Sequence, residues 1–204
     1  MGTAAISSYS DYEQLVGGIE TLFGAGGAAN VKEYADSVGK AVYEIQEEYN
    51  MLMEAQELAM SNAGNAYKSA GMSANEYMQT VTSFAASLKQ STENEVEAAK
   101  AADQAIIDMS DNANKMGTSM ESIQNAYQGF AKQNYTMLDN LKLGYGGTKG
   151  EMERLLDDAT KLSGIEYDID NLADVYAAIH VVQTELGITG TTAKEASSTI
   201  SGSL

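Results

Sequence analysis

The sequence has 204 residues and is strongly acidic, with 12 Lys and Arg against 29 Asp and Glu and a formal net charge of −17 at pH 7. Nucleic acids and anionic membrane surfaces are bound through Lys and Arg, so the composition argues against both and favours basic partners. The chain has no cysteine, which excludes disulfides, thiolate metal sites and cysteine nucleophiles. It also has no run of about 18 apolar residues that would span a bilayer.

The residue types present favour helices. Proline and tryptophan are absent, and Ala, Met, Glu and Gln, which are good helix formers, are plentiful. No segment sustains the alternation of apolar and polar residues that a half-buried strand requires. We therefore expect an all-α protein with no sheet, built as a multi-helix bundle or an elongated array of amphipathic helices separated by Gly and Asn breaks.

In the first half of the chain, apolar residues recur at helical spacing in four segments: about 11–23, 31–38, 40–69 and 74–90. The longest has a seam that narrows to Ala59, Ala63 and Ala66, which predicts the close approach of a partner helix. Ser73 and Glu76 have the spacing of a capping box, in which each side chain bonds a free backbone N–H at the helix start.

The second half continues the helical pattern in six segments: about 92–116, 118–130, 137–141, 152–162, 172–186 and one that begins near 192. The predicted N-caps are Thr92, Thr118, Thr192, and either Asp168 or Asp170. Although ten segments carry the pattern, we expect eight or nine helices from the whole chain. The last one has no closing signal, which indicates that the sequence is part of a longer protein.

The stretch LGYGGTKGEMERLL, residues 143–156, contains the glycines and the lysine of a phosphate-binding loop. In the motif G-x-x-x-x-G-K-[ST], however, the lysine follows the glycine, whereas Lys149 precedes Gly150 and no strand leads into the loop. We interpret the stretch as a break between helices, with Thr148 as the N-cap of the second helix and Glu151 completing a capping box. Three glycines are expected to end the first helix in left-handed geometry: Gly144, Gly146 and Gly147.

Two other features resemble metal or catalytic motifs. Residues 168–171, DIDN, resemble the start of a calcium loop, but the sixth position is Ala173 instead of Gly and the twelfth is Ile179 instead of Glu. His180 is the only histidine, so a zinc site is not expected, and we interpret it as a residue at a helix surface or core edge. No metal, no cofactor and no catalytic residue is predicted.

Paired acidic residues occur repeatedly, and on amphipathic helices such pairs usually form a solvated face. We expect this of four pairs: Glu47 with Glu48, Glu93 with Glu97, Asp108 with Asp111, and Asp157 with Asp158. No aromatic cleft pattern accompanies them, so they give no evidence for an enzyme. From the residues alone, the chain is an acidic helical protein of a structural or binding type.

Three long runs closely resemble the N-terminal core of phage tail tape measure proteins from Gram-positive hosts. They are GMSANEYMQTVTSFAASL at 71–88, the stretch 101–162, which includes an idiosyncratic run from Asn112 through Glu153, and ITGTTAKEASSTISGS at 188–203. Residues 10–42 resemble the segment that precedes this core in the same family. The resemblance covers nearly the whole chain.

The resemblance implies a structural role without catalysis. Tape measure proteins are long helical chains around which the tail tube polymerises, so that their length sets tail length. It implies tail-tube protein, tail assembly chaperones, distal tail or tip proteins and other tape measure copies as partners. It also implies location in the host cytoplasm during assembly and in the tail lumen of the virion. Since 204 residues is far shorter than a whole tape measure protein, residues 1–204 are expected to form one helical fragment of it.

Within this fragment we expect possible sub-units at 1–72 and 73–204, with a hinge at 143–150.

Two functions of other classes remain open. One is a helical adaptor or interaction bundle encoded by a prophage, although the Trp-x-Gly turn of small WXG proteins is absent. The other is an enzyme on a helical scaffold, which the motifs disfavour.

Overall fold

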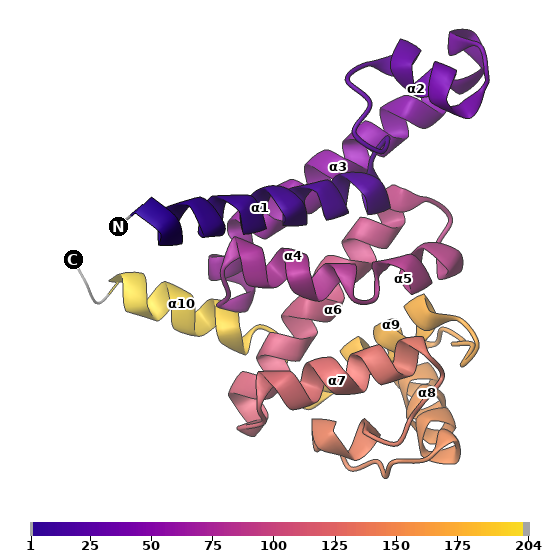
Figure 1. Ribbon diagram of the computed structural model, residues 1–204. Helices are drawn as coiled ribbons and strands as arrows, with labels where there is room; N and C mark the ends of the chain where they lie inside the picture. The colour runs from indigo at the N-terminus through magenta and orange to yellow at the C-terminus, as the bar shows by residue number, and fades with distance from the viewer. Residues whose placement is uncertain (1, 202–204) are drawn as a thin grey trace.

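The computed structural model describes residues 2–201, and in this part of the chain only helices and loops occur (Figure 1). The prediction of an all-α fold is confirmed. The described residues form ten α-helices and one 3-10 helix, η1: α1 Gly2–Phe23, α2 Val31–Val38, α3 Val42–Ala70, α4 Ala74–Thr82, α5 Ala85–Ser91, α6 Glu95–Met116, α7 Met120–Ala131, η1 Leu138–Leu141, α8 Lys149–Ser163, α9 Leu172–Glu185 and α10 Thr191–Ser201.

The helix count exceeds the eight or nine that we expected, in part because the predicted helix 74–90 is two helices. The Thr82 hydroxyl donates to the Gln79 carbonyl, and the Ser83 hydroxyl donates to the Thr80 carbonyl, where they compete with helix propagation. Phe84 then leaves helical geometry and is buried. The chain changes direction there, so that α4 and α5 both pack against α6.

The two long helices α3 and α6 form the centre of the fold. They pack along each other, and both bury a series of alanines: Ala55, Ala59, Ala63, Ala66 and Ala70 on α3, and Ala98, Ala99, Ala102 and Ala105 on α6. Small side chains allow two backbones to approach closely, as the alanine seam predicted. Around this pair, α1 packs on α3 and α4, α9 packs on α6, and α8 covers α9.

The helix α2 and the first turns of α3 project from the rest of the molecule (Figure 1). Gly39 ends α2 in left-handed geometry, at φ 69°, which confirms the boundaries predicted for this helix. Ile45 is buried where α2 folds back on α3, and the Tyr34 and Tyr49 rings lie 5.9 Å apart. The projection therefore has a small apolar contact of its own.

The capping predictions are partly confirmed. Ser73 and Glu76 form the predicted capping box at the start of α4. Thr92 is not a cap, because its hydroxyl donates to the Leu88 carbonyl at 2.9 Å. Asn94 caps α6 instead, with its side chain accepting from the backbone N–H three residues later.

The other predicted caps are displaced by one or more residues. Ser119 caps α7, because the hydroxyl of the predicted cap, Thr118, donates to Asn112 instead. Asn171, and neither of the two aspartates before it, caps α9. Thr192 lies inside α10, so it is not the cap of that helix either.

The glycine-rich loop before α8 differs in detail from the prediction. Thr148 caps α8 as expected, but the Glu151 carboxylate accepts from the N–H of Gly146, at 3.0 Å, and does not complete a capping box. The left-handed residues are Lys142, at φ 53°, and Gly144, at φ 93°. Gly146 and Gly147 are not left-handed, so the role predicted for them is wrong.

Side chains from α8 hold this loop. Arg154 donates to the Gly144 carbonyl at 2.8 Å and lies 4.3 Å from the centre of the Tyr145 ring, whose hydroxyl donates to Asp158 at 2.7 Å. The hinge at 143–150 stays a prediction. So does the division into 1–72 and 73–204, across which α3 packs on α4, α6 and α10.

Candidate functional site

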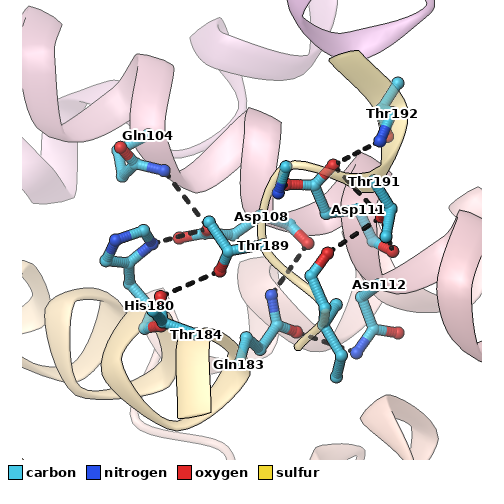
Figure 2. A network of polar contacts seen from close by, with 12 residues as sticks. Gln104, Asp108, Asp111, Asn112, His180, Gln183, Thr184, Thr189, Thr191 and Thr192 are labelled. Atoms are coloured by element: carbon cyan, nitrogen blue, oxygen red, sulfur yellow. Dashed lines mark hydrogen bonds and ion pairs between the residues drawn. The ribbon is translucent and has the colours of Figure 1, made fainter. Parts of the chain in front are cut away.

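A cluster of polar side chains lies inside the fold, between α6, α9 and α10 (Figure 2). Asp108, Asp111 and Asn112 of α6 and Gln183 of α9 are between 0% and 1% exposed. The prediction that Asp108 and Asp111 form a solvated face is therefore wrong. Their three-residue spacing places both carboxylates on one face of α6, and that face is covered by α9 and α10.

The other acidic pairs lie nearer to solvent. Both members of two pairs are exposed: Glu47 with Glu48, and Glu93 with Glu97. Asp157 is also exposed, whereas Asp158 is partly buried beside Tyr145. The solvated-face prediction therefore holds for these two pairs and for Asp157.

His180 of α9 binds the first of the two buried carboxylates. Its Nδ1 lies 2.8 Å from Asp108 Oδ1, which also accepts from the Gln104 amide at 3.2 Å. Because an ionised carboxylate only accepts hydrogen bonds, Nδ1 carries the hydrogen. The His180 side chain is 33% exposed and that of Asp108 is 1% exposed, so the histidine lies at the core edge, as predicted.

The two groups change each other's protonation. The hydrogen bond to Asp108 raises the pKa of His180 above its usual 6.5, with a further contribution from the charge of Asp111. Burial raises the pKa of Asp108 above its usual 3.8, and this outweighs the opposing effect of the His180 hydrogen bond. Both groups therefore hold their protons more tightly in the folded protein.

Two amides extend the network away from His180. Asn112 Nδ2 donates to the Leu141 carbonyl at 2.9 Å and to Gln183 Oε1 at 2.8 Å, while its Oδ1 accepts from the Thr118 hydroxyl at 3.0 Å. Gln183 Nε2 donates to the backbone carbonyl of Asp108 at 3.1 Å. The two side chains connect α6, α9, η1 and the segment before α7, and their buried polar atoms are satisfied.

The second buried carboxylate, Asp111, binds the start of α10. Its Oδ2 accepts from the N–H of Gly190 at 2.7 Å, and its Oδ1 accepts from the N–H of Thr192 at 2.9 Å. The Thr191 hydroxyl lies 3.3 Å from the Asp111 backbone carbonyl. A helix N-terminus presents free N–H groups and positive dipole charge, which a carboxylate satisfies well.

A shallow hollow of about 170 Å³ lies beside His180. It is lined by Ala101, Gln104, Ala105, Asp108, Ala173, Tyr176, Ala177 and His180. None of these is Ser, Thr or Cys, and the Tyr176 hydroxyl donates to the Tyr127 carbonyl at 2.7 Å. The geometry provides an oriented imidazole and a buried carboxylate without an adjacent nucleophile, so it supports proton uptake and ion pairing more than group transfer.

The structure separates the other motif residues from this network. Lys149 is exposed in the first turn of α8. Ala173 and Ile179 lie within α9, so residues 168–179 do not form a twelve-residue calcium loop. No group of three or more His, Asp or Glu residues in the described part of the chain is arranged to hold a metal ion. No helix there is both long and apolar enough to cross a membrane.

The network was missed from the sequence, because its carboxylates do not lie on the apolar stripe that the spacing of α6 predicts. At about 100° per residue, Asp108 and Asp111 are turned well away from Met109, on the side where an acidic helix usually meets solvent. Their partners come from α9 and α10, more than 70 residues away in the chain. Local spacing along α6 therefore gives no signal of the network.

Comparisons with known proteins identified no relative of this chain. No family model, no curated protein and no solved structure matches the chain. The fold and the network define an all-helical protein in which two buried carboxylates of one central helix hold the two helices that end the described chain.

Proposed function

We propose that this chain is a segment of a phage tail tape measure protein and acts as a structural component without catalysis. The observation that carries the proposal is the resemblance of the run 101–162, from the middle of α6 through α8, to the N-terminal core of that family. The all-helical fold is compatible with such a protein, because tape measure proteins are helical. The proposal extends to the partners and location of the family: tail-tube protein, chaperones, tip proteins, other copies, the host cytoplasm and the tail lumen.

The folded arrangement bears on how such a segment would act. The described ends of α1 and α10 point to the same side of the molecule in Figure 1, and helices α1 and α3–α9 share one core. A folded unit of 204 residues has a radius of gyration of about 17 Å. Laid out as one continuous helix, the same chain would reach about 300 Å.

Tail length in the phage tests the proposal. Deleting in frame the codons that encode this segment from the full-length gene should shorten the tail by about 300 Å if the segment is extended there. It should shorten the tail by only about 50 Å if the segment stays folded. Duplicating the segment should lengthen the tail by the same amount, which covers the case in which the deletion blocks assembly.

Assembled tails of normal length from both the deletion and the duplication would refute the ruler role. The measurement is the distribution of tail lengths by negative-stain electron microscopy. An in-frame duplication of an equally long stretch elsewhere in the helical part of the same gene serves as the control, since it should lengthen the tail whatever this segment does.

A second function, a helical adaptor or interaction bundle encoded by a prophage, is favoured by one observation. Helices α1 and α3–α9 bury one continuous apolar core of their own, so these helices do not need a tube wall to cover that core. Binding to immobilised tail-tube protein separates the two functions. Retention by the tube protein supports the tape measure segment, and retention by another prophage protein in its place supports the adaptor.

A further inference from the structure

The helix α10 is attached to the rest of the fold in an unusual way. No side chain of residues 191–199 is buried. By contrast, the neighbouring helix α9 buries one whole face, with Val175 and Ile179 almost fully covered. Burial of apolar side chains is the main source of helix stability in a folded protein, and α10 obtains little of it through these residues.

The polar contacts that hold α10 to α6 are concentrated at its first turn. The Asp111 carboxylate accepts from the N–H groups of Gly190 and Thr192, at 2.7 Å and 2.9 Å. Asp111 is fully buried, so these are charge-assisted bonds in a poorly solvated place, where their loss is costly. The start of α10 is therefore held much more firmly than its later turns.

The connection from α9 to α10 provides a pivot. Ile188 is buried, which fixes the middle of the connection to the core. Gly190 follows at φ 87°, a conformation that other residues rarely adopt, and a side chain there would meet no atom within 4 Å. Rotation about Gly190 would move α10 without disturbing the buried contact of Ile188.

The space beneath α10 also favours its release. A hollow of about 530 Å³ is lined by residues of α10, including Thr192 and Glu195, and by residues of α6, including Ser110. The hydroxyls of Ser110 and Thr192 are buried there without a hydrogen-bond partner. A buried, unpartnered hydroxyl disfavours the closed state, because opening lets water satisfy it.

We propose that α10 is a strap that opens as a unit about Gly190, and that the Asp111 carboxylate is its latch. In the open state the faces of α3 and α6 that α10 covers become exposed to solvent, while the rest of the bundle stays folded. This inference rests on contacts within the chain and does not depend on the proposed function.

Thiol labelling measures the opening directly, because the chain has no cysteine of its own. In Ser110→Cys the thiol lies at the hollow under α10 and should react when the strap opens. In Ala98→Cys, the matched control, the thiol replaces a fully buried side chain on α6 and should react only on global unfolding. We expect labelling at position 110 to be at least about 100-fold faster than at position 98.

The substitution Asp111→Asn tests the latch, because it keeps the shape of the side chain and removes its charge. Added to the Ser110→Cys variant, it should speed labelling by about 10- to 100-fold, as expected for the loss of hydrogen bonds to a charged group. Added to the Ala98→Cys variant, it should speed labelling by a similar factor, because global unfolding also breaks the Asp111 contacts, so that position 110 stays at least about 100-fold faster than position 98. Amide hydrogen exchange in unlabelled Asp111→Asn should accelerate evenly along residues 193–199, and not only in the first turn.

Three outcomes overturn the inference. Equal labelling rates at the two thiols would mean that α10 opens only with the whole fold. Labelling at position 110 that Asp111→Asn does not speed would mean that the Asp111 carboxylate is no latch. Exchange that is graded from the last turn of α10 and insensitive to Asp111→Asn would mean that the helix frays from its end.

Discussion

Replacing His180 with glutamine should destabilise the fold by about 2 kcal/mol at pH 6. The substitution removes the imidazolium that lies 2.8 Å from Asp108 Oδ1 and leaves the Gln104 amide, at 3.2 Å, as the partner of that oxygen. Hydrogen bonds to charged groups contribute about 1.5–3 kcal/mol, and breaking a fully buried pair costs about 3–5 kcal/mol. Because the His180 side chain is 33% exposed, the lower range applies.

The penalty should depend on pH with a defined sign. The pKa of His180 is raised above 6.5 in the folded protein, so its contribution to stability is complete below pH 6.5 and is lost as pH rises through the folded pKa. Above that value a neutral imidazole donates an ordinary hydrogen bond, which contributes about 1 kcal/mol. The penalty of His180→Gln should therefore be about 1 kcal/mol smaller at pH 8.5 than at pH 6.

Asp108 acts in the same direction at lower pH. Its pKa is raised above 3.8 by burial, so the folded state binds this proton more tightly than the unfolded state does. The stabilisation that comes from this tighter proton binding is complete below pH 3.8 and is lost as pH rises through the folded pKa of Asp108. Measurements at pH 6 and above are intended to isolate the histidine.

Urea unfolding at pH 6 and pH 8.5 provides the free energies, and a double-mutant cycle with Asp108→Asn isolates the pair. Asp103→Asn is the matched control, since Asp103 lies on the same helix and accepts from the Tyr77 hydroxyl at 2.7 Å. Its cost should not change between these pH values. His180 is the only histidine in the chain, so the pKa of its ring can be measured by NMR titration. An equal His180→Gln penalty at both pH values, or a ring pKa below 6.5, would refute the reasoning.

Three other predictions concern packing and ligands. Gly147→Ala should lower the free energy of unfolding in urea by about 2–3 kcal/mol, because its Cβ would collide with the backbone carbonyl of Thr136. Gly150→Ala lies in open space on α8 and should instead raise the free energy of unfolding by about 0.5–1 kcal/mol. Ala59→Leu, at a 3% exposed position on α3, should cost about 1–3 kcal/mol by forcing the central helices apart, and an unchanged stability would contradict their close packing. Calorimetry with ATP or calcium should give no saturable signal. A micromolar ATP signal would contradict our interpretation of Lys149, and a micromolar calcium signal would contradict that of Ala173 and Ile179.

The sequence by itself determined the helical class and several boundaries, because these depend on local chemistry. Gly39 and Gly117 end α2 and α6 in left-handed geometry, at φ 69° and 66°, where the helical patterns stop. The alanine seam of α3 predicted a closely packed partner. Each of these features is decided by residues within a few positions of one another, so the order of residues along the chain is sufficient to find it.

The choice among neighbouring capping residues was decided by the tertiary structure. Thr118 and Ser119 can both accept from the free N–H groups at the start of α7. Ser119 does so, while the Thr118 hydroxyl is turned toward Asn112, whose amide is held by Leu141 and Gln183 from distant parts of the chain. A rule that uses only local spacing cannot separate the two.

The fate of Asp108 and Asp111 was also decided only by the tertiary structure. By composition they are ordinary acidic residues on an acidic helix, and solvent exposure was the natural prediction. His180 lies 72 residues from Asp108 in the chain, and Gly190 lies 79 residues from Asp111. The two aspartates are buried because the fold brings these distant partners to α6. A carboxylate can leave water only where donors replace its hydration, and the positions of those donors are a property of the fold, not of the local sequence.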